Sequence, residues 1–350
     1  MIDLKDYLLK ALEVAETRRG SCAPNPAVGA VIVKDGQIIA TGTHWAAGHP
    51  HAEVDALHKA GKAAKGATLY ATLEPCCHHG KTPPCTDAIL AAGIERVVFG
   101  FADPNPVASK GCEVLTAAGI ECKQFSLPEI DLFYHSYAHW LAHQRPWVRL
   151  KLAISADAKI AGESGKPVPI SGAACNGLTQ QYRYHSDAIL TTVQTLLNDN
   201  PKMNARLPNK TVAKPLFVLD SHLRLDHSMQ VFKTAKSIVV YHRDDIATNE
   251  ALNCVPVPFN QQGLDLAVVL TDLGRRGVHD LWIEVGARAF DAFYRNQWVD
   301  EVIFYRSQKI LGEQALPAFL TASPIEAHEL EWEPLGEDEV ARLTMKSINC

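Results

Sequence analysis

The chain has 350 residues. A chain of this length is too long for a single ordinary hydrophobic core and fits two domains. Hydrophobic residues make up 47% of it and the formal net charge is -5, so the composition excludes a strongly basic protein built to bind nucleic acid. The nine cysteines are an odd number, and we find neither an apolar export signal nor a membrane-length apolar segment, so we expect a reducing, cytoplasmic environment.

The first 145 residues carry alternating signals for helices and strands. Apolar side chains recur at helical spacing over residues 4–19, and Asp35-Gly36 is a strong hairpin turn. Strands are predicted at residues 27–33, 38–41, 67–73, 96–100 and 120–125. Further helices are predicted at residues 51–60, 84–93, 111–118 and 128–143. This order predicts an α/β sandwich with a largely parallel sheet.

Arg145-Pro146 marks the boundary between two predicted domains, because proline ends the helix before it. The domains are residues 1–145 and 146–350. In the second domain, strands are predicted at residues 147–155, 187–192, 215–219, 237–241, 280–285 and 301–305. Helices are predicted at residues 172–185, 193–198, 264–275 and 288–296. The pattern is that of a second α/β domain.

His51, Glu53, Cys76 and Cys85 form the strongest chemical signal in the sequence. Zinc binds imidazole nitrogen and thiolate sulfur tetrahedrally, and three protein ligands leave a fourth position for water. A His/Cys/Cys set near a glutamate that is not a ligand is the signature of zinc-dependent deaminases. We therefore expect His51, Cys76 and Cys85 to hold one zinc ion, with Glu53 as the general acid and base. Because residues i and i+2 do not share a helix face, we expect His51 at the irregular first residue of its helix.

Each of these residues taken alone has a structural explanation. A His-x-Glu at a helix start is usually a cap, and a lone cysteine is usually a buried apolar filler. His78 and His79 are alternative ligands, whereas Cys77 is expected to point away and pack. The two proposed cysteines are preferred because Pro84 suits the first helical turn and places Cys85 at a helix N-terminus, where the dipole favours a thiolate.

The chain resembles one known family over nearly its whole length. The stretches PNPAVGAVIV, GHPHAEVDAL, TLEPCCHHGKTPPCTDAIL and DPNP resemble the deaminase half of the bifunctional riboflavin-biosynthesis deaminase/reductases. The long spacing from Cys76 to Cys85 differs from the short Cys-x-x-Cys of cytidine and tRNA adenosine deaminases. The stretches KLAISAD, YHSDAIL, LLNDNP, LDS and WIEVGA resemble the reductase half of the same family.

The resemblance implies a cytidine-deaminase-like α/β/α sandwich followed by a dihydrofolate-reductase-like α/β domain. The family deaminates 2,5-diamino-6-(5-phosphoribosylamino)pyrimidin-4-one to 5-amino-6-(5-phosphoribosylamino)uracil. It then reduces the ribosyl group to a ribityl group with NADPH. We accordingly expect a small phosphorylated pyrimidine as substrate, a homo-oligomer (a dimer first), and neither nucleic acid nor membrane as a partner.

The resemblance also implies site residues in both halves. In the deaminase half, Asn25 matches a contact to the pyrimidine edge, and the ribose phosphate is held by Lys81, Thr82, Asp103 and Asn105. In the reductase half, the substrate-side positions are Lys151, Arg183, Met203, Arg206 and Glu284, and Asp199 matches both sides. The cofactor-side positions are Ala153, Pro169, Thr195, Asp199, Ser221 and the run 286–292, which begins Gly286-Ala287-Arg288. Without the resemblance, Arg183 and Arg206 would be interpreted as solvated charges.

Three departures from the family pattern fall in the reductase half. Where the family reads Ser-x-Trp-Ile-Thr/Ser, this chain reads Pro167-Val168-Pro169-Ile170-Ser171. The family's Asp-Gly is Asp157-Ala158 here, and the glycine-rich turn keeps the single Gly286. These changes predict a loosened cofactor pocket. Two rival functions are a zinc deaminase whose second domain is impaired or does not catalyse, and a nucleic-acid base deaminase, which the acidic net charge disfavours.

Overall fold

The computed structural model describes residues 4–80, 82–321 and 323–345. The chain divides into two compact units, residues 1–144 and residues 145–350, here called the first and the second unit. Each unit buries its own apolar core, one cluster of residues in the first and two in the second.

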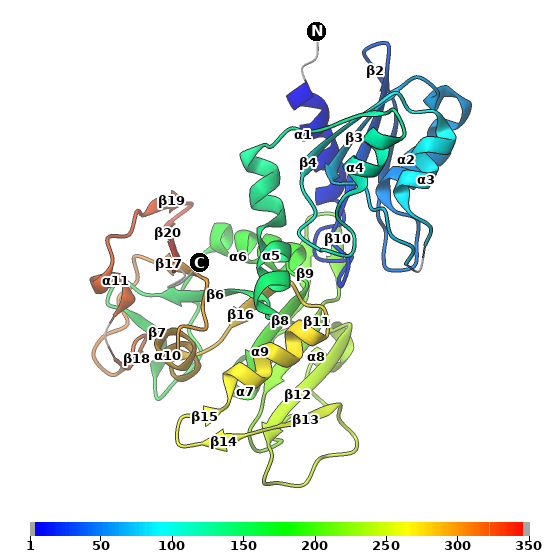
Figure 1. Cartoon of the computed structure of the whole chain (residues 1–350). Helices are drawn as coiled ribbons and strands as arrows, with labels where there is room; N and C mark the ends of the chain where they lie inside the picture. Colours follow the sequence, from blue (N-terminus) through cyan, green and yellow to red (C-terminus); the bar gives the residue numbers. More distant parts are fainter. Residues whose placement is uncertain (1–3, 81, 322, 346–350) are drawn as a thin grey trace. The chain divides into compact units, whose positions relative to one another are not determined.

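The first unit is built around a five-stranded sheet of order β2-β1-β3-β4-β5 (Figure 1). Its strands are β1 Gly29–Lys34, β2 Gln37–Thr43, β3 Thr68–Leu73, β4 Arg96–Phe101 and β5 Glu121–Gln124. Its helices are α1 Leu4–Glu16, α2 Ala52–Ala60, the 3-10 helix η1 Gly61–Ala64, α3 Cys85–Ala92, α4 Gly111–Ala117 and α5 Pro128–His143.

The sheet of the first unit is mixed, which differs from the largely parallel sheet predicted. β3, β4 and β5 are parallel neighbours, whereas β1 is antiparallel to both β2 and β3. The antiparallel pairing of β1 with β2 follows from the turn at Asp35 and Gly36, whose φ angles are 51° and 74°. Two residues with positive φ make a tight hairpin, and a tight hairpin can join only antiparallel strands.

Two glycines let helices approach the two faces of this sheet. A Cβ atom at Gly29 would lie 2.0 Å from the Ala11 carbonyl oxygen, so α1 packs directly on β1. A Cβ atom at Gly42 would lie 2.1 Å from the Ala52 carbonyl oxygen, so α2 packs directly on β2. Ala30, the residue after Gly29, pairs with Gly42, and successive strand residues point to opposite faces. The two helices therefore cover opposite faces, and the predicted α/β/α sandwich is confirmed.

The second unit is built around a nine-stranded sheet of order β13-β12-β11-β8-β16-β6-β17-β20-β19. Its strands are β6 Trp147–Ile154, β8 Ala188–Thr192, β11 Pro215–Leu219, β12 Ser237–Arg243, β13 Cys254–Val257, β16 Asp280–Glu284, β17 Glu301–Arg306, β19 Glu333–Leu335 and β20 Asp338–Thr344. Three separate pairs are β9 Ala205–Leu207 with β10 Lys210–Val212, β14 Phe259–Asn260 with β15 Gly263–Leu264, and β18 Ala315–Pro317 with β7 Lys159–Glu163. The helices are α6 Ala173–His185, α7 Val193–Asp199, α8 Val231–Thr234, α9 Leu266–Arg275, α10 Ala287–Arg295 and α11 Pro324–Ala327.

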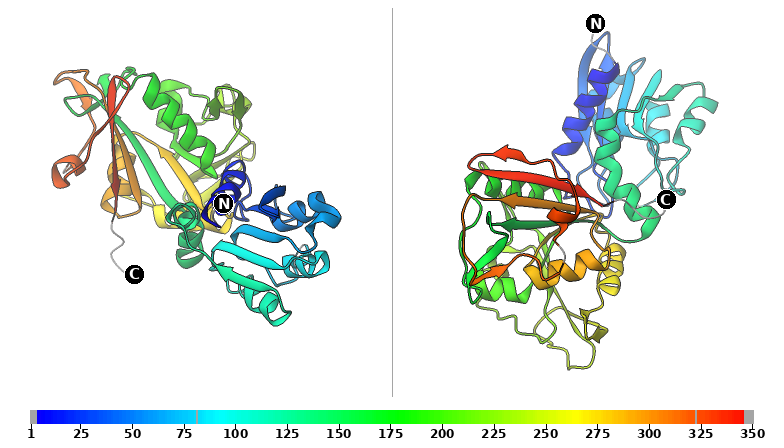
Figure 2. Two further views of the ribbon diagram at one scale, coloured as in Figure 1. Left: turned by 90° about the horizontal axis from the view of Figure 1, so that it is seen from above. Right: turned by 90° about the vertical axis from the view of Figure 1, so that its left-hand side faces the viewer.

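Helices cover both faces of this second sheet. The strands from β13 to β17 are parallel, and β20 and β19 add an antiparallel edge. In Figure 2 the red β20 lies beside the orange β17. Buried residues of α9 and α10 belong to one apolar cluster, and those of α6, α7 and α8 belong to the other. This arrangement confirms the predicted second α/β domain.

The strand order of the second sheet reverses around β16. This strand lies between β8 and β6, although both precede it in the chain. Glu284 at its end pairs with Lys151 of β6 on one side and with Thr191 of β8 on the other. In open α/β sheets, ligands bind outside the carboxyl ends of the strands where the strand order reverses. The sheet therefore brings Glu284 and Lys151 to a place where a ligand site is expected.

Every helix and strand that the sequence predicted is present, with ends that differ by a few residues. His51 is the N-cap of α2 in an extended conformation, with φ of -70° and ψ of 163°, as expected. Pro84 is the N-cap of α3 instead of its first helical residue, and Cys85 begins the helix. The structure adds the seven-residue strand β20 and several short elements that the sequence did not predict, namely η1, β7, β9, β10, α8, β13, β14, β15, β18, α11 and β19.

Candidate active sites

Three metal-ligating side chains meet in the first unit. His51 precedes α2, Cys85 begins α3, and Cys76 lies in the loop after β3. The His51 Nδ1 atom lies 3.2 Å from the Cys85 sulfur and 3.4 Å from the Cys76 sulfur. Among the residues that the structure describes, these three are the group whose ligand atoms, all within 4.8 Å of one another, could hold a metal ion.

The spacing and chemistry of this group fit zinc. Tetrahedral bonds of about 2.3 Å to sulfur and about 2.0 Å to nitrogen would separate the nitrogen and a sulfur by about 3.5 Å. The Cys76 sulfur accepts hydrogen bonds from Cys85 and His51, which lower the pKa of the Cys76 thiol to about 4 against the opposing effect of burial. A thiol that ionises readily is a good zinc ligand.

The alternative ligands lie outside this group. His79 is exposed, with its Nε2 atom 4.0 Å from the Asp87 carboxylate. His78 is not among the side chains that converge on His51. The Cys77 sulfur lies 3.1 Å from the Ser109 carbonyl oxygen, so it packs against that loop as the sequence predicted.

Glu53 is buried beside the ligand group, with 3% of its surface exposed. Burial raises the pKa of its carboxyl group to about 7, while the charge of His51 and a hydrogen bond with Cys85 pull the pKa down. A carboxyl group with a pKa near neutrality can both take and return a proton at physiological pH. This is the property that a general acid and base requires.

Asn25 and Thr82 contact the histidines of this site. The Asn25 Nδ2 atom lies 3.0 Å from the His44 Nε2 atom, and the Thr82 hydroxyl lies 3.3 Å from the His51 Nε2 atom. The ring of His44 lies edge-on to that of His51, with 5.3 Å between centroids, and burial lowers the pKa of His44. The sequence did not reveal His44, because none of the recognised motifs includes it. Lys81 lies outside the described residues.

Asp103 and Asn105 form a turn near the same site, and the side chain of Asp103 is buried. The Asp103 carboxylate accepts hydrogen bonds from the Asn105 backbone N–H at 2.9 Å and from the Tyr137 hydroxyl at 3.3 Å. Burial raises the pKa of Asp103 to about 6, and the neighbouring Glu74 and Cys76 add to the shift. The Asp103 backbone N–H lies 3.4 Å from the carboxylate of Glu74, which is two residues before Cys76 in the chain, so this turn lies close to the ligand group. Tyr137, from α5, is a positioning contact that the sequence did not reveal.

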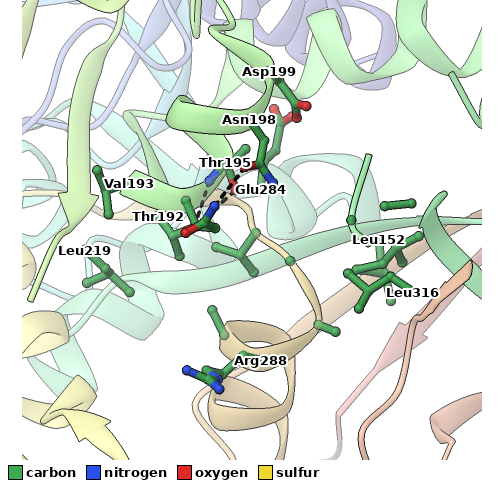
Figure 3. A pocket seen from close by; sticks show the side chains of 18 of the residues that line it. Leu152, Thr192, Val193, Thr195, Asn198, Asp199, Leu219, Glu284, Arg288 and Leu316 are labelled. Atoms are coloured by element: carbon green, nitrogen blue, oxygen red, sulfur yellow. Dashed lines mark hydrogen bonds between the residues drawn. The ribbon is translucent and has the colours of Figure 1, made fainter. Parts of the chain in front are cut away.

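The second unit has a pocket of about 870 Å³ at the carboxyl ends of its parallel strands (Figure 3). Its walls include residues from the ends of β6, β8, β11 and β16. Figure 3 shows Arg288, from α10, on the opposite side of the opening from Asp199, from α7. A concave site of this volume suits a small molecule or a cofactor.

The Glu284 carboxylate is held by a buried arginine. The Arg183 Nε atom donates to it at 2.5 Å and the Nη2 atom at 2.9 Å, and Trp282 Nε1 donates at 2.8 Å. Burial alone would raise the pKa of Glu284, but the charge and hydrogen bonds of Arg183, the charge of Lys151 and the Trp282 hydrogen bond together outweigh burial and hold the pKa at about 2. Arg183 is only 6% exposed, so it is not the solvated charge of the alternative interpretation. Partial burial lowers the pKa of Lys151, and the charge of Glu284 opposes this.

The pocket brings together most of the residues assigned to the reductase site. Those that line it are Lys151, Ala153, Pro169, Thr195, Asp199, Ser221, Glu284, Gly286, Ala287 and Arg288. Arg183, Met203 and Arg206 do not line it. These three residues lie together around Asn204, behind Glu284. Arg183 donates to the Asn204 carbonyl at 3.0 Å and lies 3.6 Å from the Met203 sulfur. Arg206 is exposed and donates to the Asn204 side chain at 2.7 Å.

Two of the departures from the family pattern have structural consequences. Pro169 lines the pocket, and its carbonyl oxygen accepts a hydrogen bond from Lys309 at 2.6 Å. Ala158 has a φ of 55°, in the left-handed region that favours glycine. The adjacent Asp157 carboxylate accepts hydrogen bonds from the backbone of Leu311 and Gly312, at 3.1 and 2.8 Å, and these hold the turn.

The fold and the two sites define a class of protein: a deaminase with a zinc-binding region, joined to an α/β domain with a cofactor-sized pocket. Family models agree with this class. Residues 1–101 match the cytidine and deoxycytidylate deaminase zinc-binding region, and residues 146–341 match the RibD C-terminal domain. None of the helices among the described residues is long and apolar enough to cross a lipid bilayer.

Curated relatives and solved structures identify the family. The chain is 36% identical to the riboflavin biosynthesis protein RibD of Escherichia coli (88% of this chain and 89% of that protein) and 36% identical to RibD of Aquifex aeolicus (96% and 97%). The structure of Acinetobacter baumannii RibD matches with a TM-score of 0.85 at 33% identity, over 98% of this chain and 99% of that one. A deaminase/reductase structure from Thermotoga maritima matches with a TM-score of 0.85 at 31% identity, over 97% and 98%. The chain belongs to the RibD family, and it is a bifunctional enzyme of riboflavin biosynthesis with deaminase and reductase activities.

Proposed function

We propose that the first unit deaminates 2,5-diamino-6-(5-phosphoribosylamino)pyrimidin-4-one and that the second unit reduces the ribosyl group of the product with NADPH. The observation that carries the first step is the buried Glu53 beside the convergent His51, Cys76 and Cys85. The observation that carries the second step is the pocket in which Lys151 of β6 and Glu284, at the end of β16, lie side by side on paired strands.

In the deamination, His51, Cys76 and Cys85 would hold one zinc ion per chain. Bound there, zinc would supply a Lewis acid that makes water nucleophilic near neutral pH. Glu53 takes a proton from the attacking water and delivers it to the leaving amino group. Asn25 orients the pyrimidine edge, and Thr82, Lys81 and the Asp103 turn hold the ribose phosphate.

In the reduction, the substrate side of the pocket is fixed before any ligand binds. The Arg183 ion pair and the Trp282 hydrogen bond leave the Glu284 carboxylate a single orientation. Lys151, which pairs with Glu284 on the neighbouring strand, offers an ammonium group that can donate hydrogen bonds to the sugar hydroxyls. The N-terminal end of α10, with Arg288, faces the same pocket and offers positive charge to cofactor phosphates.

Product analysis tests both steps at once. The purified chain is incubated with the diaminopyrimidine phosphate, with and without NADPH, and the products are identified by mass spectrometry. Deaminated product in both incubations, and ribityl product only with NADPH, is the expected result. Release of no ammonia would reject the proposed substrate, whereas deamination without reduction in the presence of NADPH would reject the second step.

The same observations favour one second candidate, a deaminase whose second unit is impaired in cofactor use. Pro169 stands in the pocket where the family has an aromatic residue, and Ala158 holds a backbone conformation that suits glycine. Titration of the purified chain with NADPH decides between the candidates. Binding at micromolar NADPH supports the bifunctional assignment, and no binding at millimolar NADPH supports the impaired second unit.

A further inference from the structure

Glu74 is a buried acid of the first unit that the proposed deamination does not use. It directly follows β3 and precedes the proposed ligand Cys76 by two residues. Only 8% of its surface is exposed, and both oxygens of its carboxylate accept hydrogen bonds from backbone N–H groups. Burying a carboxylate costs free energy unless hydrogen bonds satisfy its oxygens, so the partners of Glu74 indicate what it does.

The two oxygens of this carboxylate hold the two ends of the β4–α4 loop, residues 102–110. Oε2 accepts a hydrogen bond from the Asp103 backbone N–H at 3.4 Å, and Oε1 accepts one from the Cys112 backbone N–H at 3.1 Å. Asp103 lies just after β4, and Cys112 lies in the first turn of α4. An ionised carboxylate has only acceptors, which suits two N–H donors at once. One side chain therefore ties both ends of the loop to the chain just before Cys76.

Two further contacts bring the β4–α4 loop directly against residues 74–77. A Cβ atom at Gly111 would lie 1.7 Å from the Pro75 carbonyl oxygen, so the start of α4 approaches this backbone as only glycine allows. The Cys77 sulfur lies 3.1 Å from the Ser109 carbonyl oxygen. The loop that carries Asp103 and the segment that carries the ligand Cys76 are therefore packed without a gap, and Glu74 is the polar link between them.

The β4–α4 loop carries two of the residues proposed to hold the ribose phosphate. The Asp103 carboxylate accepts hydrogen bonds from the Asn105 backbone N–H at 2.9 Å and from the Tyr137 hydroxyl at 3.3 Å. The Asn105 side-chain oxygen accepts a hydrogen bond from the Val107 backbone N–H at 3.1 Å. These contacts fix the shape of the turn, whereas Glu74 fixes its distance from the ligand group.

We propose that Glu74 is a positioning residue for the deamination and that it makes the first unit select a pyrimidine whose ribose carries a phosphate. This inference rests on the proposed function, because it assumes that the reacting amino group lies at Glu53 and the ribose phosphate at the Asp103 turn. Glu74 acts only through the loop, by fixing the distance between these two places. A substrate that spans both places can use the binding energy of its phosphate to orient the reacting ring, and a substrate without the phosphate cannot.

The test compares two substrates on four forms of the full chain. Wild type, Glu74→Gln, Gly111→Ala and Glu113→Gln are first checked for zinc content and thermal unfolding. Each is then assayed for ammonia release from the diaminopyrimidine phosphate and from its dephosphorylated riboside. In Glu74→Gln the side chain keeps its size, but an amide group replaces one accepting oxygen and leaves one backbone N–H of the loop without an acceptor.

We expect Glu74→Gln to keep its zinc and to lose selectivity. Its kcat/KM for the phosphate should fall by about tenfold or more, chiefly through a higher KM, while kcat/KM for the riboside stays unchanged. Gly111→Ala displaces the same loop through its backbone and should change the ratio of the two kcat/KM values in the same direction. Glu113→Gln removes an exposed acid from the first turn of the same helix and should match wild type.

The possible failures are distinguishable. An equal loss with both substrates, or an unchanged ratio, in either variant that folds with its zinc would overturn the inference and leave the proposed function intact. Loss of zinc from Glu74→Gln, or failure of both variants to fold, would overturn it as well, because Glu74 would then serve the ligand group or the fold itself. If the wild-type chain released no ammonia from the phosphate, the proposed substrate would fail, and the inference would fail with it.

Discussion

Glu53 is held two residues after the proposed ligand His51, and its role can be separated from metal binding. Glu53→Gln keeps the size of the side chain and changes none of the three proposed ligands. We expect the variant to keep its zinc and to lose deamination by a factor on the order of 10² to 10⁴, because it removes the group that moves the proton. Metal analysis and an ammonia-release assay on the same preparation measure both properties.

Two cysteine variants provide the matched controls for this experiment. Cys85→Ala removes a proposed ligand and should lose the metal, because two protein ligands rarely hold zinc. Cys77→Ala removes a neighbouring thiol that contacts the Ser109 carbonyl and should keep the metal. Full zinc in Cys85→Ala would contradict the ligand set, and near-normal turnover in Glu53→Gln would assign the proton transfer to another residue.

The ion pair between Arg183 and Glu284 makes the stability of the second unit depend on pH. The pKa of Glu284 in the folded protein is about 2, below the ordinary value of 4.5. The ionised carboxylate therefore makes its full contribution to the free energy of unfolding above about pH 4.5. This contribution, roughly 3 kcal/mol at most, is lost as the pH falls toward 2. Urea unfolding of wild type and Glu284→Gln at several pH values measures it. The variant should be less stable near neutrality and should lose less stability on acidification, and parallel pH profiles would contradict the assignment.

Single residues could be predicted from the sequence where a short motif carries the chemistry. The ligand set and Glu53 lie in such motifs, at helix starts that the sequence also marks. His44 and Tyr137 could not be predicted, because their contacts with Asn25 and Asp103 join residues that are 19 and 34 positions apart in the chain. Trp282 was missed for a different reason: its indole donates to Glu284, two residues further along the same strand, but in the sequence it is indistinguishable from an ordinary buried strand residue.

At the scale of helices and strands, the spacing of apolar residues predicted the elements that are long enough for the pattern to repeat. The short pairs β9 with β10 and β14 with β15 have only two or three residues in each strand, too few to show a period. β20 was missed because its buried residues, Asp338, Val340 and Ala341, do not alternate regularly. The antiparallel pairing of β1 with β3 was missed because strand order depends on distant contacts.

The segment from Pro167 to Ser171 is the element whose sequence departs most from the family. Pro169→Trp should lower the dissociation constant for NADPH by up to about tenfold, since an aromatic ring in this wall restores a stacking surface. Pro167→Ala is the control, because it relaxes the backbone of the same segment without adding a ring. Fluorescence titration gives the constants, and stopped-flow oxidation of NADPH gives the rate. Unchanged or weaker binding in Pro169→Trp would show that the missing aromatic residue is not the cause of weak binding.

At the scale of the whole molecule, the two chemical sites have no residue in common. His51, Glu53, Cys76 and Cys85 belong to the first unit, and the lining of the 870 Å³ pocket belongs to the second. Deamination should therefore run at its full rate without any nicotinamide cofactor. Ammonia release measured with and without NADPH tests this, and a strict requirement for NADPH would contradict two separate sites.

The position of β16 between β8 and β6 has a consequence for how the protein forms during synthesis. On the ribosome, β6 and β8 emerge long before β16, and neither can pair with its central neighbour until residues 280–284 have been made. The first unit has all of its strands by Gln124 and can collapse around its own core much earlier. Nascent chains arrested near Arg275 should therefore carry a protease-resistant first unit followed by a protease-sensitive second one. The reductase pocket, whose walls come from both sides of β16, can close only after this last central strand has inserted.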